Sequence, residues 1–317
     1  MPAIGFICPD GEKILFSACM EDCRLKDSLP LGRCKADPYL SRLARPRKWT
    51  GHPSTTQLIK GTREAWLEIT REYYINPDDM AYAFSGTFSH AVLERFASSE
   101  DNLLEERLRD DICSGQFDFY SGKSGVLYDY KTWGSYKVQQ ALGIKSGFKW
   151  VPKKKDGKVM YKTVNGEKKV AFWDKKPSLT YDCDVTRTFG VLETSIQLSD
   201  YRDKIRRILP EGYEVRKLGI QAICRDSGLG IQKERGIKEK APLIPVNGVS
   251  SHWVQAYLQR KRELLLMAIE KEHTAPCRRS SRWYPSEPSK PTFKEILTCL
   301  KCSKYCTVKS FCKEVGE

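Results

Sequence analysis

The sequence has no apolar segment long enough to span a membrane. Its longest apolar run, residues 264–269, belongs to a stretch with the periodicity of an amphipathic helix. The first residues also lack the long apolar stretch of a secretory signal. We therefore expect an intracellular, cytoplasmic protein without a membrane partner.

Acidic residues are also in short supply. The 317 residues include 40 Asp and Glu against 54 Lys and Arg, which gives a formal net charge of +14 and a pI near 9.2. Such an excess favours a polyanionic partner, and nucleic acid is a stronger candidate than an anionic membrane surface. No group of residues suggests base-specific contacts, so we expect binding to DNA that does not depend on sequence.

The twelve cysteines do not indicate a disulfide framework, because the chain is neither small nor visibly secreted. Four precede residue 35, and we expect them to bind one zinc ion: Cys8, Cys19, Cys23 and Cys34. The spacing of Cys19 and Cys23 places them on one face of a predicted helix. Scattered thiols and a share in an iron–sulfur cluster are the alternatives.

Five cysteines follow residue 276. Thiolates at this density are stable when a soft metal neutralises them, so an iron–sulfur cluster or Zn²⁺ is expected to fasten the tail to the domain. The expected ligands are Cys277, Cys302, Cys306 and Cys312, with Cys299 as an alternative to Cys277.

Residues 115–131 predict two short strands joined by a Gly/Ser/Lys turn. The first carries Asp118, and the second carries Asp129 and Lys131 on one face, which Asp118 can approach. Two carboxylates and an ammonium group suit Mg²⁺ or Mn²⁺ and the hydrolysis of a phosphodiester. The alternative is an ordinary surface ion pair.

Histidine is scarce as well, with four in the chain. His90 lies in a predicted helix over residues 78–97, shortly before the acidic strands. It is a candidate metal ligand, and a structural hydrogen-bonding role is the alternative.

Residues 147–174 predict a lysine-rich β-meander with turns at Asp156-Gly157 and Asn165-Gly166. The lysines suggest a clamp on a phosphate backbone, a docking surface for a protein partner, or simply a soluble edge. A strand is also expected over residues 103–108, a helix over 191–209, a buried strand over 217–226, a loop over 228–249 and a helix over 251–272.

In the helix over residues 191–209, Gln197 and Tyr201 share a face. Both side chains can donate hydrogen bonds to phosphate oxygens, which would position a nucleic-acid strand. The alternative is that they merely cover the edge of the core.

The order helix-strand-strand-strand-helix-strand over residues 78–226 resembles the PD-(D/E)XK nuclease superfamily, and within it the RecB-type nucleases. The residues that carry the resemblance are His90, Asp118, Asp129-Tyr130-Lys131 and Gln197-x-x-x-Tyr201. The cysteine spacing of the tail also resembles the iron–sulfur staple of AddB-type and CRISPR-associated members. The resemblance implies an α/β, restriction-endonuclease-like core with cysteine-rich extensions over residues 1–77 and 227–317.

The resemblance also assigns roles. His90, Asp118, Asp129 and the Tyr130 carbonyl would ligate Mg²⁺ or Mn²⁺, and Lys131 would orient and activate the water. Gln197 and Tyr201 would hold the substrate strand. The expected function is a metal-dependent, exonuclease-like deoxyribonuclease; the alternatives are a catalytically weak nucleic-acid-binding module and a partner-docking subunit.

Overall fold

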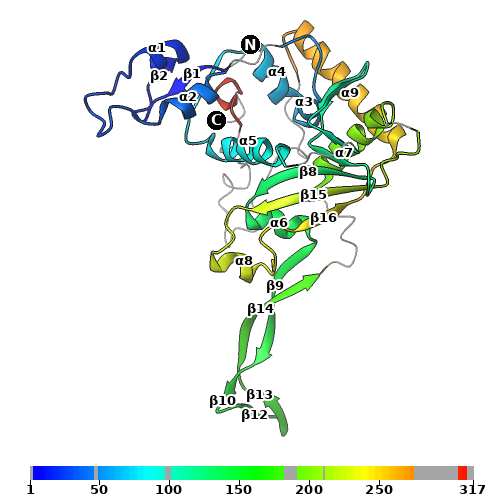
Figure 1. The fold of residues 1–317 in the computed structure, drawn as a ribbon. Coiled ribbons are helices and arrows are strands. Elements are labelled where there is room, and N and C mark those ends of the chain that lie inside the picture. Colours follow the sequence, from blue (N-terminus) through cyan, green and yellow to red (C-terminus); the bar gives the residue numbers. More distant parts are fainter. Residues whose placement is uncertain are drawn as a thin grey trace.

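The computed structural model describes residues 3–45, 49–96, 101–181, 191–209, 211–274 and 306–312. In this part of the chain the fold is mixed α/β, as expected, and its centre is a five-stranded sheet (Figure 1). The strand order is β16-β15-β8-β7-β4, with bounds Leu243–Val246, Lys217–Cys224, Val126–Trp133, Phe119–Ser121 and Asn102–Leu104. The predicted strand that carries Asp129 and Lys131 is thus confirmed as β8, and that over residues 217–226 as β15.

Strands β8 and β15 pair in parallel, whereas the other neighbours in this sheet are antiparallel. Parallel strands require a long crossover connection, and here that connection includes α7 (Leu192–Ile205). Leu198 and Ile205 of α7 share one buried core with Leu127 of β8 and Ile220 of β15. Burying each such side chain contributes about 1.5–3 kcal/mol, so this contact holds α7 against the sheet.

A second core joins the two ends of the described chain. Helix α4 (Thr62–Thr70) packs against α9 (Ser251–Glu270), and Val308 is fully buried between their side chains. Helix α3 (Thr55–Ile59) precedes α4 and begins at Ser54, whose side chain and that of Gln57 form a reciprocal capping box. Segments from residues 1–77 and 227–317 therefore share one core.

The N-terminal segment forms a small lobe, at the left of Figure 1. Its sheet has the order β2-β1-β3, with bounds Lys13–Leu15, Ala3–Ile7 and Tyr73–Ile75. Helices α1 (Phe16–Glu21) and α2 (Asp37–Leu43) complete it. The buried core is small and consists of Phe6, Cys19, Leu40 and Ile75. A lobe with so few buried side chains gains little stability from its core.

The predicted meander is a protruding arm, which extends away from the rest of the molecule in Figure 1. Its stem pairs β9 (Ile144–Pro152) with β14 (Trp173–Tyr181). Its tip holds two small hairpins, whose strands are Lys154–Lys155, Lys158–Val159, Tyr161–Val164 and Glu167–Val170 (β10 to β13). Both predicted turns are present, with positive φ at each turn residue: Asp156, Gly157, Asn165 and Gly166.

Several elements differ from the expectation. Residues 228–249 contain α8 (Gly230–Glu234) and β16 instead of a continuous loop. Helix α6 (Ser135–Ala141) follows β8 and has no counterpart in the predicted elements. The predicted strand over residues 103–108 is divided into β4 and β5 (Arg107–Arg109). The predicted strand that carries Asp118 is divided into β6 (Ser114–Gln116) and β7, and Asp118 lies between them. None of the described helices is both long and apolar enough to cross a membrane.

Candidate metal-binding site

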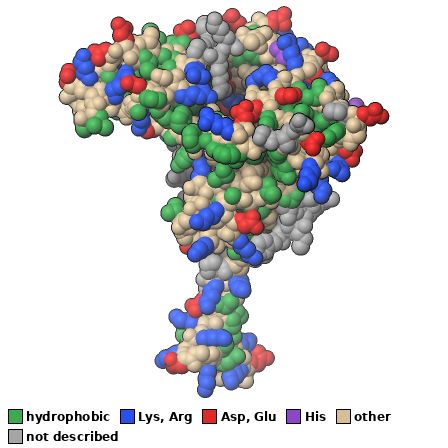
Figure 2. All heavy atoms as spheres, viewed as in Figure 1, with side chains coloured by type: hydrophobic (Ala, Val, Ile, Leu, Met, Phe, Trp, Pro, Cys, Tyr) green, Lys and Arg blue, Asp and Glu red, His purple; other side chains and the backbone are tan. Residues whose placement is uncertain are grey.

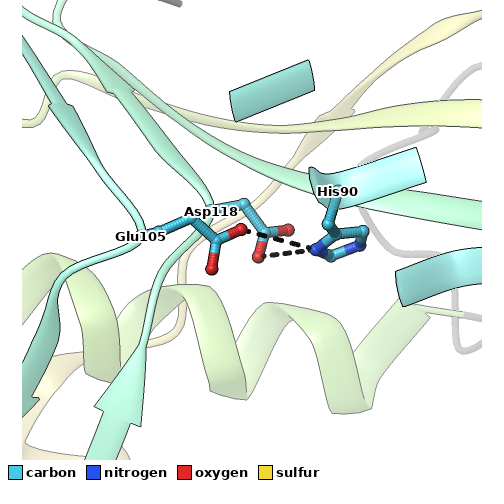
Figure 3. Close-up of side chains that lie close together, drawn as sticks. All are labelled: His90, Glu105 and Asp118. Carbon is cyan, nitrogen blue, oxygen red and sulfur yellow. Dashed lines mark ion pairs between the residues drawn. The ribbon is translucent and has the colours of Figure 1, made fainter. Parts of the chain in front are cut away.

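Three side chains from separate elements converge beside β8 (Figure 3). His90 comes from α5 (Ala81–Glu94), Glu105 follows β4, and Asp118 lies in the bend before β7. His90 Nδ1 is 3.3 Å from Asp118 Oδ1 and 3.7 Å from Glu105 Oε1. One ligand atom from each residue lies within 4.8 Å of the other two, and no other such group of His, Cys, Asp or Glu occurs among the described residues.

The site forms where the β7–β8 ladder ends. The last pair of that ladder is Phe119 with Tyr128, so the backbone of Tyr130 has no strand partner on the β7 side. Its N–H donates instead to Asp118 Oδ2 over 2.6 Å, and its carbonyl accepts from His90 Nε2 over 2.9 Å. The Asp118 and His90 side chains thus take the place of a neighbouring strand. They are positioned by hydrogen bonds to the Tyr130 N–H and C=O groups, which would otherwise lack partners.

Asp129 and Lys131 flank Tyr130 on β8 and share a face, as predicted from strand alternation. Lys131 Nζ lies 2.7 Å from Asp129 Oδ2. Asp129 is only 3% exposed, and this burial raises the pKa of its carboxyl group to about 6. The Lys131 charge acts in the opposite direction and lowers this pKa, whereas the Asp118 charge raises it further. Asp118 and His90 are close enough to influence the pKa of Asp129, but Asp129, a predicted metal ligand, is not part of the group formed by His90, Glu105 and Asp118.

Burial works to lower the pKa of Lys131, but the charges of Asp129 and Asp118 outweigh it and hold this pKa above its ordinary value. Lys131 is therefore a cation at neutral pH. It can donate hydrogen bonds and stabilise negative charge, but it cannot accept a proton.

Glu105 is a member of this site that the sequence pattern did not indicate. It has a φ of 46°, in the left-handed region that side chains other than glycine seldom adopt. Its N–H donates to the carbonyl of Asp118 over 3.2 Å, and Gln116 Nε2 donates to its Oε2 over 2.6 Å. Backbone strain of this kind concentrates at functional sites. The visible clue was the Glu105-Glu106 pair at the break in an otherwise strand-like segment.

The two carboxylates act strongly on His90. Hydrogen bonds with Asp118 and Glu105 raise its pKa from 6.5 to about 10, although burial opposes this. The imidazole is thus a cation at neutral pH in the metal-free protein and neutralises the carboxylates that face it. A metal ion at this position must displace that proton, so its affinity should rise with pH.

The raised pKa of His90 predicts how stability depends on pH. Because the folded pKa lies above the unfolded value, the ion pairs contribute fully below pH 6.5 and are lost as the pH rises towards about 10. For a side chain that is 28% exposed we expect about 1–2 kcal/mol. In EDTA, the Tm difference between the wild type and His90→Gln should be largest at pH 6 and small at pH 10. A difference that grows with pH would contradict this assignment.

The predicted pair on α7 is present, with Gln197 Nε2 donating to the Tyr201 hydroxyl over 3.0 Å. Tyr201 is only 4% exposed, and burial raises the pKa of its hydroxyl group. Its ring lies against Gly115, where an added Cβ would come within 2.2 Å of Tyr201 Cε1. The Tyr201 side chain thus packs from α7 onto β6. Gln197 is the more exposed member of the pair.

The four N-terminal cysteines all belong to the small N-terminal lobe. Burial raises the pKa of the Cys19 thiol, and the neighbouring Cys34, Cys8 and Cys23 thiolates raise it further. No three of their sulfur atoms all lie within 4.8 Å of one another, unlike the ligand atoms of the His90 group. The expected helix face is not formed, because α1 ends at Glu21, before Cys23.

The C-terminal cysteines are described only in part, since Cys277, Cys299 and Cys302 lie outside the described residues. Cys306 packs against the second core, and Cys312 Sγ lies 3.9 Å from Arg63 Nη1 on α4. Thr307 also donates to Glu68 Oε1 of α4 over 3.0 Å. The described part of the tail is therefore fastened to α4.

Comparisons with known proteins identified no relative of this chain. No protein-family model, curated protein or solved structure matches this chain. The functional argument therefore depends on the arrangement of the residues themselves.

Proposed function

We propose that this protein is a metal-dependent deoxyribonuclease that hydrolyses phosphodiester bonds. The observation that carries the proposal is the placement of a histidine–carboxylate cluster and an Asp129–Lys131 ion pair around one backbone residue, Tyr130. With β5, β6, α6 and the strands of the arm left aside, the chain order α5, β4, β7, β8, α7, β15 also agrees with the helix-strand-strand-strand-helix-strand order of the PD-(D/E)XK core. That agreement supports a restriction-endonuclease-like core.

The donor set fits a divalent cation. Carboxylate oxygens of Glu105 and Asp118 and a nitrogen of His90 already lie within 4.8 Å of one another, and Asp129 acts electrostatically on the same group. Carboxylates suit Mg²⁺ and Mn²⁺, and the imidazole favours Mn²⁺. When bound, the ion would lower the pKa of a water molecule and neutralise charge on a phosphate oxygen.

The chain's own groups supply the remaining functions. Lys131 would donate hydrogen bonds to the attacking water and stabilise the negative charge that develops on the phosphate. Asp129 holds the Lys131 ammonium group at 2.7 Å and so fixes its position. Gln197, the more exposed member of the α7 pair, would contact the substrate backbone.

The direct test is incubation of the purified protein with end-labelled single- and double-stranded DNA and either Mn²⁺ or Mg²⁺. We expect cleavage that EDTA abolishes, with Mn²⁺ supporting the higher rate. Release of mononucleotides from the labelled end would identify exonuclease action. Binding without cleavage under all metal conditions would reject the proposal and leave a nucleic-acid-binding module.

The cysteines suggest a separate structural role for metals. We propose that Cys8, Cys19, Cys23 and Cys34 bind one zinc ion that stabilises the small N-terminal lobe. The C-terminal cysteines would hold an iron–sulfur cluster or a second zinc ion. Both arrangements follow from the affinity of thiolates for soft metals.

The N-terminal zinc site predicts a countable change in metal content. Cys23→Ser should lower the zinc content by about one ion per chain and destabilise the protein, because a structural zinc contributes directly to folding. Cys224→Ser is the matched control, since Cys224 lies on β15 of the central sheet and not in the N-terminal lobe. Elemental analysis of the purified proteins measures the effect. Equal zinc in Cys23→Ser and wild type would exclude the site.

A further inference from the structure

The protruding arm carries much of the molecule's positive charge. Residues 144–181 include eleven lysines and three carboxylates, a formal charge of +8 within a chain total of +14. Nine of these lysines are exposed: Lys149, Lys153, Lys154, Lys155, Lys158, Lys162, Lys168, Lys169 and Lys176. Figure 2 shows lysine side chains distributed over the arm. Apart from Ile144 at its base, no described side chain of the arm is buried.

The arm also exposes large aromatic side chains. Trp150 is 64% exposed and Trp173 53%, and Phe172 and Tyr161 are similarly open. In the β9–β14 ladder Trp173 lies opposite Pro152, two residues from Trp150. Cross-strand partners and residues two apart share a face, so the two tryptophans lie diagonally on one face of the stem. Diagonal positions are about 7–8 Å apart, which leaves room for a flat ring between the indoles.

The strand register places lysines directly opposite one another. Lys149 faces Lys176 on the stem, and Lys162 faces Lys169 at the tip. Like charges at such positions destabilise a strand pair. The arrangement costs stability in the isolated arm, and an anionic ligand would offset that cost. Because neighbouring strands are only about 5 Å apart, lysines on either face can reach a phosphate backbone that follows the edge of the ribbon.

We propose that this arm binds single-stranded DNA, with bases stacked on Trp150 and Trp173 and phosphates held by the surrounding lysines. The identification of this bound strand as the substrate rests on the proposed nuclease function, which the inference extends. Bases of a single strand offer free ring faces to aromatic side chains, whereas those of a duplex are already stacked on each other. Lysines alone would bind the phosphates of a duplex as well as those of a single strand. The two exposed tryptophans on one face therefore favour single-stranded over double-stranded DNA.

The test measures binding in EDTA, where cleavage is not expected. A fluorescein-labelled oligo(dT) and a labelled duplex are titrated with wild type, Trp150→Ala/Trp173→Ala and Trp253→Ala. The last variant is the matched control, because Trp253 is 45% exposed on α9, outside the arm. We expect the double variant to lose about tenfold or more in affinity for oligo(dT), and the control to bind within about twofold of wild type.

The lysines are tested by salt dependence. Replacing Lys149 and Lys176 by Gln should reduce the slope of log K against log[salt] for oligo(dT) by about 0.7 for each phosphate contact removed. Far-UV circular dichroism should match the wild type for all arm variants, and their Tm should not fall below it, since their side chains lie outside the three buried cores.

The outcomes separate this inference from the proposed activity. If the double tryptophan variant binds oligo(dT) as tightly as wild type, the arm proposal is wrong, whether or not the wild type cleaves DNA. If the lysine variant loses only duplex affinity, the arm is a duplex clamp and the single-strand assignment is wrong. If the wild type fails to cleave but oligo(dT) binding depends on the two tryptophans, the arm proposal holds and the nuclease proposal falls.

Discussion

Asp118→Asn is expected to lower the rate of DNA cleavage by about 10³-fold while leaving DNA binding in EDTA close to wild type. Asparagine has nearly the same shape and can still accept the hydrogen bond from the Tyr130 N–H. It lacks the negative charge that pairs with His90 at 3.3 Å and that would attract a divalent ion. The loss should therefore appear in the chemical step and in the concentration of Mn²⁺ required.

Glu105 provides the matched comparison for this prediction. Glu105→Gln should also reduce cleavage strongly, because its carboxylate belongs to the metal-binding group. Glu106→Gln changes the same charge one residue along the chain, at an exposed position that is not part of the group, and should be close to wild type. Equal activity in both variants, or full activity in Asp118→Asn, would remove this cluster from the mechanism.

The second large effect is expected in stability. Lys204 on α7 is 3% exposed and pairs with Asp200, one helical turn earlier, and with Asp110 Oδ2 at 3.2 Å. Asp200 Oδ2 also accepts from Thr55 Oγ1 of α3 over 2.6 Å, and Lys204 donates to Cys113 Sγ over 3.3 Å. The network ties α7 to α3 and to the turn between β5 and β6.

Lys204→Met is expected to destabilise the protein by about 3–5 kcal/mol, because it leaves the buried carboxylate of Asp200 and the partly buried one of Asp110 without their cation. Burial already raises the pKa of Asp200 above its ordinary value, so the carboxylate alone is unfavourable there. Urea denaturation followed by circular dichroism measures the change.

Two further variants test the cause. Lys204→Met/Asp200→Asn removes one of the uncompensated charges and should recover part of the lost stability. Lys217→Met changes an exposed lysine at the start of β15 and should cost less than about 0.5 kcal/mol. A Lys204→Met protein as stable as the Lys217→Met protein would show that the network does not stabilise the fold.

Local sequence was sufficient for the features that depend on near neighbours. The Asp156-Gly157 and Asn165-Gly166 turns follow from the positive φ that these residues tolerate. The start of α3 at Ser54 follows from a capping box with Gln57, three residues later. The alternation along β8 placed Asp129 and Lys131 on one face, and the structure pairs them at 2.7 Å.

Long-range contacts decided the rest. Glu105 enters the site because β4 and β5 separate at that residue, and the pattern of residues 103–108 shows only one continuous strand. Lys204 contacts Asp110, and Asp200 contacts Thr55, although the partners are far apart in the chain, so no spacing in the sequence indicates these contacts. Likewise, the hairpin turns predicted the strands of the arm but not its projection from the body. In the structure the strands of the arm pair only with one another, and none joins the five-stranded sheet.

The chain by itself therefore determined the turns, the caps and the face of β8 that carries the acid and the lysine, because each depends on dihedral preferences or alternation within a few residues. Only the tertiary structure decided that His90 and Asp118 occupy the unpaired backbone of Tyr130, and that Glu105 joins them. The reason is physical: β7 stops pairing with β8 at Tyr128, and the hydrogen bonds left open there are satisfied by side chains from remote segments.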